Sequence, residues 1–392
     1  MMEWKEVELG SLVRRKIGYG IVQPGASPSE GVPLIKVNNI ISGLTSVCEL
    51  DKTTIEIDNK YPRTKLNGGE LIISLVGTVG KTAIVPSAFA GCNLVRATGL
   101  IDIEEPIIAN WVKYYIDSDR GQDYIKKHLN TTVQATLNVK SLVEMPIPIT
   151  QKCYMEKVVS ILSSLDDKIA VNKKICENLE AQAQALFKHW FVDFAPFKDS
   201  KFIDSELGLI PEGWRVGTLG DIAEFKRGKT ITKSDVKEGL IPVVAGGLEP
   251  AYYHNQSNTS SRVITISGSG ANAGFTKMYY QPVWASDCSF VDNASTSLLH
   301  TAYCYLLINK KKVDALQWGA AQPHVYAKDI NKLPLAIAPL DVLNQFEEMI
   351  SEMFDLIEVN DKETTRLATL RDTLLPKLMS GQIKVNDIEK SL

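Results

Sequence analysis

The sequence is poor in sulfur and histidine and has no long apolar run. Six cysteines are spread over 392 residues without a CxxC pair, and the five histidines are equally scattered. Disulfide scaffolds and structural metal sites need several closely spaced ligands, so we expect reduced thiols and no bound metal. No run approaches the roughly 18 apolar residues of a membrane-spanning helix, and the start lacks a basic-then-apolar signal pattern. These absences predict a cytoplasmic chain without a membrane segment.

Motifs for bond chemistry are also missing. The segment GTVGKT at 77–82 lacks the first glycine of a P-loop, because Leu75 stands in its place. Two interpretations of it stay open: a turn whose amides and Lys81 face a phosphate, or a plain turn between strands. DNA methyltransferases hold the target base with a tetrapeptide that begins Asn-Pro-Pro or Asp-Pro-Pro, and neither tripeptide occurs in this sequence. We therefore expect a non-catalytic chain without a cofactor.

The chain contains an internal duplication. The segment 134–190 matches 322–378 without a gap, and the pattern of Trp, Leu and Gly that begins at Trp4 recurs, with a different offset, at Trp214. The stretches between these matches hardly align. The sequence therefore predicts two copies of a unit of roughly 190 residues, each with a variable body and a fixed tail. Such an arrangement suits one scaffold that presents two different surfaces.

The matched tails carry heptad repeats. Apolar positions from Val158 to Trp190 follow steps of four and three without a skip, and the same phase recurs from Phe346 to Leu378. This pattern predicts two coiled-coil helices. Helices of roughly 35–40 residues would be about 55–60 Å long.

Two asparagines and one proline interrupt these seams. Asn172 and Asn360 occupy the same seam position, where a buried Asn costs stability but fixes register. If the helices pair antiparallel, the two residues should meet at the centre, within about 10 Å; the alternative is that both face solvent. Pro376 should kink or end the second helix, and Gly381 suits a helix stop.

The net charge of −3 hides an uneven distribution. Residues 1–151 and 214–338 together carry 29 basic and 25 acidic groups, whereas the remaining segments carry 14 and 21. Basic side chains near aromatic and amide groups are suited to positioning phosphates and reading bases, although surface charge is often only solvated. The residues predicted to contact DNA are Arg14, Arg15, Lys16, Tyr19, Lys81, Lys226, Arg227, Lys229, Lys233 and Lys277.

Several segments resemble the specificity subunits of type I restriction-modification systems. They are SELGLIPEGW at 205–214, GAAQPHV at 319–325, LRDTLLPKLMSGQIKV at 370–385 and WFVDFAPF at 190–197. The first copy departs from the family pattern at two places. The segment VQATLNV at 133–139 lacks the Gln-Pro pair that GAAQPHV has in the second copy, and QKCYMEK at 151–157 lacks the Glu-Gln pair that is usual in the family. The resemblance nevertheless covers the whole chain and agrees with the duplication.

The resemblance implies an α+β fold, a tandem duplication of a mixed α/β target recognition domain followed by a long helix. The two helices would form an antiparallel coiled coil. The expected parts are recognition domain one at 1–151, helix one at 152–191, a linker at 192–213, recognition domain two at 214–339, helix two at 340–381 and a tail at 382–392. Strands are expected at 70–76 and 263–266, and short helices at 110–116 and 301–308.

The resemblance also implies partners. Each recognition domain would read one half of a bipartite site in double-stranded DNA, and the coiled coil would set the spacing and dock two modification subunits. Those subunits carry S-adenosylmethionine and methylate adenine, and restriction subunits join them in the larger complex. Two other classes stay open: a self-contained DNA-modifying enzyme, disfavoured by the missing motifs, and a coiled-coil adaptor with two ligand-binding lobes.

Overall fold

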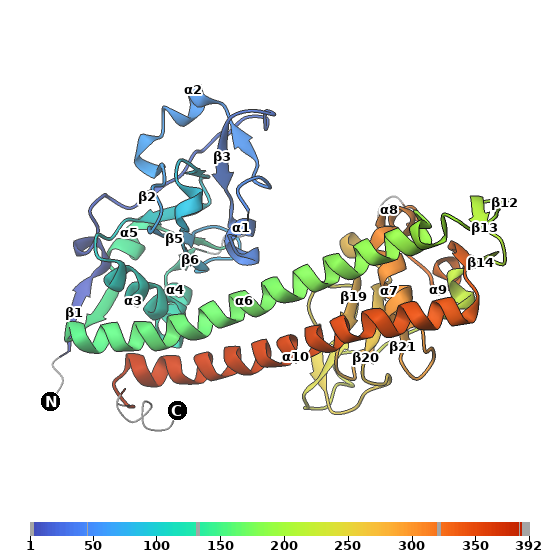
Figure 1. Cartoon of the computed structure of the whole chain (residues 1–392). Coiled ribbons are helices and arrows are strands. Elements are labelled where there is room, and N and C mark those ends of the chain that lie inside the picture. The colour runs from blue at the N-terminus through green and yellow to red at the C-terminus, as the bar shows by residue number, and fades with distance from the viewer. Residues whose placement is uncertain (1–3, 45, 131–133, 320–322, 384, 386–392) are drawn as a thin grey trace. The chain divides into compact units, whose positions relative to one another are not determined.

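The computed structural model describes residues 4–44, 46–130, 134–319, 323–383 and 385. The chain forms two compact units, shown in Figure 1. Unit 1 comprises residues 1–168 and 366–392, and unit 2 comprises 169–365. Each unit therefore contains one body and about half of each long helix. No helix within the described ranges has the length and apolar character needed to cross a membrane.

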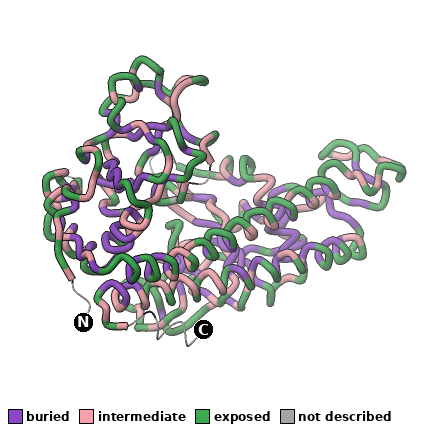
Figure 2. Tube along the Cα trace, turned by 60° about the vertical axis from the view of Figure 1, so that its left-hand side comes forward, coloured by how far each residue is buried: buried purple, intermediate pink, exposed green. Residues whose placement is uncertain are grey.

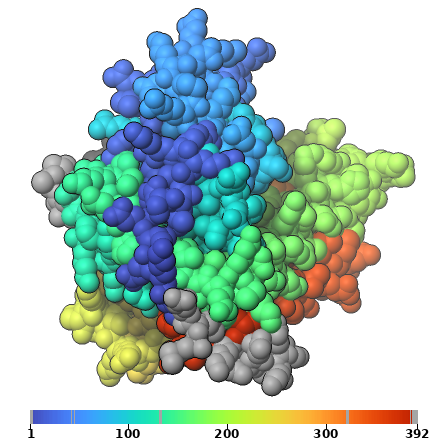
Figure 3. Space-filling model, turned by 90° about the vertical axis from the view of Figure 1, so that its left-hand side faces the viewer, coloured from blue at the N-terminus to red at the C-terminus, as the bar shows by residue number. Residues whose placement is uncertain are grey.

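The body of unit 1 contains a four-stranded sheet, in the order β2-β8-β5-β6, and a three-stranded sheet, β4-β3-β7. A separate antiparallel pair, β1-β11, joins the beginning and the end of the body. In Figure 3 the N-terminal segment, in dark blue, runs along the surface of this body. The elements are β1 (Lys5–Glu8), β2 (Gly18–Tyr19), β3 (Val32–Ile35), α1 (Val37–Ser42), β4 (Lys52–Thr53), α2 (Ile55–Asp58), β5 (Leu71–Ser74), β6 (Thr82–Ile84), β7 (Asn93–Leu94), β8 (Thr98–Ile101), α3 (Pro106–Asp117), α4 (Asp119–Lys127), β9 (Leu129–Asn130), β10 (Thr136–Leu137), α5 (Val139–Val143) and β11 (Pro146–Ile149).

The body of unit 2 repeats this arrangement. Its sheets have the orders β15-β21-β18-β19 and β17-β16-β20, and β14 pairs with β22. The elements are β12 (Phe202–Ser205), β13 (Gly208–Pro211), β14 (Arg215–Thr218), β15 (Lys226–Arg227), β16 (Ile241–Val244), β17 (Tyr252–His254), β18 (Val263–Ser267), β19 (Thr276–Tyr279), β20 (Trp284–Ala285), β21 (Cys288–Asp292), α7 (Leu299–Ile308), α8 (Lys310–Asp314), α9 (Ala327–Ile330) and β22 (Pro334–Ile337). The expected strands and short helices all fall within these elements or overlap them.

The two matches of the duplication meet in one strand pair of each body. Lys5 of β1 pairs with Ile149 of β11, and Arg215 of β14 pairs with Ile337 of β22. Lys5 and Arg215 each follow the repeated tryptophan directly, and Ile149 and Ile337 hold the same place in the matched tail segments. The intervening stretches hardly align in sequence, yet they form the same sheets in the same order. The difference in length between the bodies therefore lies in the connections between strands.

The long helices α6 (Lys152–Phe191) and α10 (Leu340–Met379) are 40 residues each, about 60 Å long. In unit 1 the Tyr154 hydroxyl donates to the Leu378 carbonyl at 2.8 Å, and in unit 2 Phe187 packs edge-on to Phe346. A second contact in each unit, between Asp166 and Arg371 in unit 1 and between Asn172 and Glu363 in unit 2, shows that α10 runs opposite to α6, so the helices are antiparallel within each unit, as predicted. Every seam position is buried or half-buried (Figure 2). The heptad pattern therefore identified the packed faces.

The seam asparagines are both buried, with exposed fractions of 0% for Asn172 and 7% for Asn360, so the solvent-facing alternative is wrong. They do not share a hydrogen bond. Asn172 donates its side-chain amide to Glu363 at 2.7 Å, whereas Asn360 donates to the Leu356 carbonyl of its own helix. Glu363 lies about one helical turn beyond Asn360. The role of the pair in register stays a prediction.

Pro376 does not end α10, which continues to Met379. Proline has no amide hydrogen, so α10 lacks the bond from residue 376 to the carbonyl of residue 372, yet three further residues stay helical before the helix ends. Gly381 follows with a φ of 70°, and its amide donates to the Leu378 carbonyl. Glycine enters this left-handed region without strain, so the predicted helix stop is confirmed.

Candidate nucleic-acid interface

The first basic cluster is tied to buried carboxylates. Arg14 Nη2 lies 2.6 Å from Asp102 Oδ1, and Arg15 Nε lies 2.5 Å from Asp102 Oδ2. Arg15 also reaches Glu70 at 3.3 Å and donates to the carbonyls of Arg63 and Lys65. Burial alone would raise the pKa of Asp102, but the hydrogen bonds from both arginines outweigh it and lower that pKa. Arg15 therefore has a structural role, and its contact with DNA stays a prediction.

The glycine-rich segment 77–82 is a turn between β5 and β6. The amides of Gly77 and Gly80 donate to the carbonyls of Ala135 and Ser74, and the Lys81 amide donates to Ser74 Oγ. Gly77 and Gly80 have φ values of 80° and 85°, which only glycine adopts easily. Because these three amides are bonded within the protein, the plain turn is the favoured interpretation, and a contact of Lys81 with a phosphate stays a prediction.

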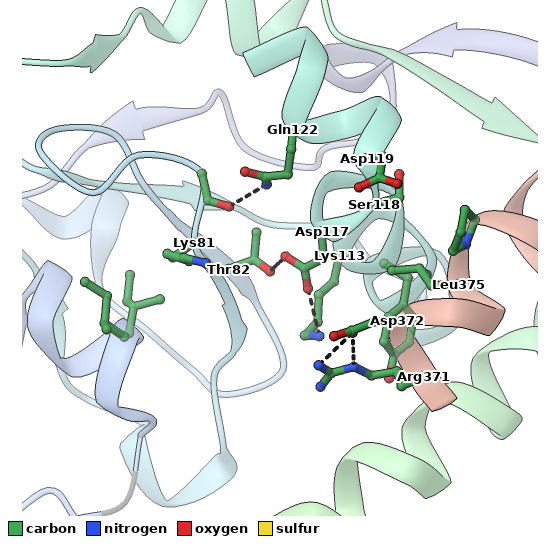
Figure 4. A pocket seen from close by; sticks show the side chains of 15 residues that line it. Lys81, Thr82, Lys113, Asp117, Ser118, Asp119, Gln122, Arg371, Asp372 and Leu375 are labelled. Atoms are coloured by element: carbon green, nitrogen blue, oxygen red, sulfur yellow. Dashed lines mark hydrogen bonds and ion pairs between the residues drawn. The ribbon is translucent and has the colours of Figure 1, made fainter. Parts of the chain in front are cut away.

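A polar pocket of about 640 Å³ lies beside this turn in unit 1. Figure 4 shows Lys81 and Thr82 on one side, Arg371 of α10 on the other, and Lys113 and Asp117 of α3 between them. Asp117 accepts from Thr82 at 2.6 Å and from Lys113 at 3.0 Å. Arg371 pairs with Asp166 and Asp372, at 2.7 and 2.8 Å. The charges of the pocket thus neutralise one another, which disfavours binding of a phosphate there.

The predicted residues of unit 2 lie at two places. Lys226 and Arg227 form β15 at the edge of the four-stranded sheet, with Lys229 just beyond, and all three side chains are exposed, as is Lys233. Lys277 on β19 instead lies over the ring of Tyr279, with its Nζ 5.0 Å from the ring centroid. Burial raises the pKa of Asp361 on α10, and the positive charge of Lys277 partly opposes that rise. Lys277 is therefore placed toward the long helix.

Tyr19 lies on β2 and lines a hollow of about 790 Å³ in unit 1, whereas Lys16 is exposed just before that strand. We define hollow 1 by Tyr19, Val76, Arg96, Ala97, Gln134 and Thr136. Tyr19, Arg96 and Gln134 are exposed, and none of their side chains forms a hydrogen bond with a described residue. Arg96 was missed from the sequence because it stands alone, outside any basic cluster.

Unit 2 has a smaller hollow, of about 40 Å³. We define hollow 2 by Arg227, Asp287, Cys288, Ser289, His324 and Tyr326. Asp287 accepts a hydrogen bond from Ser269, and the His324 ring stacks on Tyr326 with a centroid distance of 6.1 Å. Asp287 and His324 were also missed, since neither belongs to a charge cluster or a motif.

The two hollows lie at the same place in the fold. The Gly77 amide donates to Ala135 at 2.9 Å, and the Gly270 amide donates to Pro323 at 3.0 Å. The isolated bridge between Val76 and Thr136 likewise has its counterpart between Ser269 and His324. Thr136 and His324 are also aligned with each other by the sequence match of 134–190 with 322–378.

A close approach of two backbone segments supports both hollows. A Cβ on Gly20 would lie 2.2 Å from the Leu94 carbonyl oxygen, and one on Gly228 would lie 2.5 Å from the Ser286 carbonyl oxygen. Each glycine amide also donates to the neighbouring strand, to Thr98 and Cys288 respectively. Glycine is therefore required at the same point in both bodies.

One protein-family model matches most of the chain. A model described as the type I restriction modification DNA specificity domain matches residues 1–181 and 211–371. The chain belongs to this family. The two matches correspond to the two copies of the duplication, each a body with part of its long helix.

Specificity subunits from several organisms are similar to the chain. The type I restriction enzyme MjaIX specificity subunit of Methanocaldococcus jannaschii is 26% identical, over 73% of this chain and 71% of that protein. The type I restriction enzyme HindI specificity subunit of Haemophilus influenzae is 22% identical, over 98% of this chain and 100% of that protein. The crystal structure of a type I S subunit from M. genitalium aligns with a TM-score of 0.54, at 16% identity and 96% coverage of both chains. This last similarity supports the fold of the specificity-domain family.

Proposed function

We propose that this chain is the DNA-recognition subunit of a type I restriction-modification complex, and that each body reads one half of a bipartite target. The observation that carries the proposal is the duplication, in which one backbone framework presents two different sets of exposed side chains. A protein that bound one uniform ligand twice would need the same side chains in both copies. Two different half-sites need different ones. The recognition domains proposed are residues 1–151 and 214–339.

In the proposed complex the antiparallel helices hold the two bodies at a fixed spacing and dock two modification subunits. A helix pair with a packed seam is stiff enough for such a role. The helical segments are acidic, whereas the bodies together are slightly basic. This division favours protein partners for the helices and DNA for the bodies. Restriction subunits would join the larger complex.

We also propose that the chain itself performs no bond chemistry. Its sequence lacks a P-loop and the tetrapeptide of base methyltransferases. The relatives with which it aligns over most of its length are named as specificity subunits. Methyl transfer would therefore belong to the modification subunits, and sequence choice to this chain.

The proposal is tested by selection from a pool of random duplex DNA. The cognate modification subunit is incubated with the pool in the presence and in the absence of this chain, and retained DNA is sequenced. We expect a motif of two separated blocks only when the chain is present, with binding that weakens steeply as salt increases. Equal enrichment without the chain, or no enrichment with it, would contradict the proposal.

A further inference from the structure

We propose that the side chains that line hollow 1 and hollow 2 contact base edges of duplex DNA and determine which base pairs each body selects. This inference rests on the proposed function and assigns the choice of bases to particular side chains. The hollows are the equivalent places in the two bodies where an identical backbone arrangement carries different side chains. They are therefore the points at which two copies of one fold can acquire two specificities.

Equivalent positions of the two hollows carry different side chains. Tyr19 on β2 pairs with Gly99 of β8, and Arg227 on β15 pairs with Ser289 of β21, so Tyr19 and Arg227 are equivalent. The bridges described above make Thr136 equivalent to His324 and Val76 equivalent to Ser269. Where the first body has an aromatic ring, the second has a guanidinium. The threonine hydroxyl of the first body corresponds to an imidazole, and its valine corresponds to a serine. Each hollow contains one arginine, Arg96 or Arg227, but at a different position of the shared framework, whereas a site that bound only phosphates would keep its cation in place.

Hollow 1 has the chemistry to read purines. The Arg96 guanidinium can donate two parallel hydrogen bonds to O6 and N7 of guanine, and the Gln134 amide can pair with N6 and N7 of adenine. Both side chains are exposed and have no side-chain hydrogen bond to a described residue, so binding breaks no such bond. The volume of about 790 Å³ is ample for the edges of adjacent base pairs.

Hollow 2 is narrow, with about 40 Å³ of free volume, so its contacts must come from its rim. Arg227 on the exposed edge of the sheet offers the same paired donors for guanine. The carboxylate of Asp287 is an acceptor held in place by the Ser269 hydroxyl, and an acceptor suits the N4 amino group of cytosine. The two bodies therefore offer different patterns of donors and acceptors.

The test repeats the selection with the full complex and variants of one hollow at a time. Arg96→Ala and Gln134→Ala should each reduce discrimination about tenfold to a hundredfold at one position of one block, and leave the other block unchanged. Arg227→Ala should do the same in the other block only. Arg63→Ala removes another exposed arginine of the first body, outside hollow 1, and should leave the motif intact.

Conservative changes keep the test independent of folding. Gln134→Glu replaces a donor by an acceptor, so preference at its position should move from adenine toward cytosine. Variants that keep the wild-type motif, or that lose affinity equally on all sequences with a smaller salt slope, would overturn the assignment of the hollows. A wild-type complex that selects no two-block motif would instead overturn the proposed function, so the two failures are distinguishable.

Discussion

At the scale of single residues, Glu347 on α10 shows how unit 2 fastens its body to the long helix. Its carboxylate accepts hydrogen bonds from the amides of His300 and Thr301 and from the Thr301 hydroxyl, at 2.6–3.0 Å, and His300 Nδ1 lies 2.8 Å away. The His300 ring also stacks on Phe354. Burial alone would raise the pKa of Glu347, but these bonds outweigh it and lower that pKa.

Because the folded pKa of Glu347 lies below its ordinary value of 4.5, the ionised carboxylate stabilises the fold above about pH 4.5. That contribution is lost as pH falls through the folded pKa. Glu347→Gln should therefore lower the free energy of unfolding by about 3 kcal/mol at pH 7, and by much less at acid pH. Melting curves of the wild type and the variant from pH 7 downward measure the difference.

The neighbouring exposed residue provides the control. Glu348→Gln removes the same charge from the same helix without a buried partner, so its melting curve should follow the wild type within about 0.5 kcal/mol. A difference for Glu347→Gln that stayed constant with pH would contradict the assigned role of the carboxylate.

Residue roles were the least predictable feature of the sequence. Arg14 and Arg15 look like any exposed basic cluster, because Asp102 and Glu70, which bind them, are far away in the chain. The lining of hollow 1 is likewise assembled from β2, the connection before β8 and the segment leading to β10. Such sites depend on strand pairing between distant segments, which one sequence does not reveal. Tyr19 and Arg227, both predicted from the sequence to contact DNA, are exposed residues of equivalent strands, and their contact with DNA stays a prediction.

At the scale of elements, the long helices were predictable because a heptad repeat is a local pattern. Period, length and seam followed from the spacing of apolar residues alone. The partner of Asn172 did not, since it depends on how the helices are offset along one another. The Asn172 side-chain oxygen is buried without a hydrogen-bond partner among the described residues. An unpartnered buried acceptor reduces stability.

Asn172→Leu should therefore raise the free energy of unfolding by about 1 kcal/mol, since the loss of its bond to Glu363 only partly offsets the gain. Asn360→Leu is the matched variant at the same heptad position of α10, and should gain less because the Asn360 amide already bonds within its helix. Denaturant unfolding of both variants gives the comparison. A fall in stability for Asn172→Leu would contradict this account and favour an essential role in register.

At the scale of the whole molecule, the duplication was visible in the sequence, but the likeness of the two bodies was not. Only the ends of each body align, and the two ends align with different offsets. The sheets between them share strand order because pairing depends on buried alternation and turn geometry, which many different sequences satisfy. The two bodies are therefore recognisably alike in strand order even where their sequences no longer align. The side chains that line the two hollows differ between the bodies, as two different half-sites would require.

The central claim is that this chain supplies the sequence choice of a type I system through two separate readers. The most direct measurement is a genome-wide map of adenine methylation in cells that express the chain with its cognate modification subunit. We predict one asymmetric motif of two blocks with a constant gap, absent when the chain is omitted. A continuous motif, or methylation that persists unchanged without the chain, would contradict the claim.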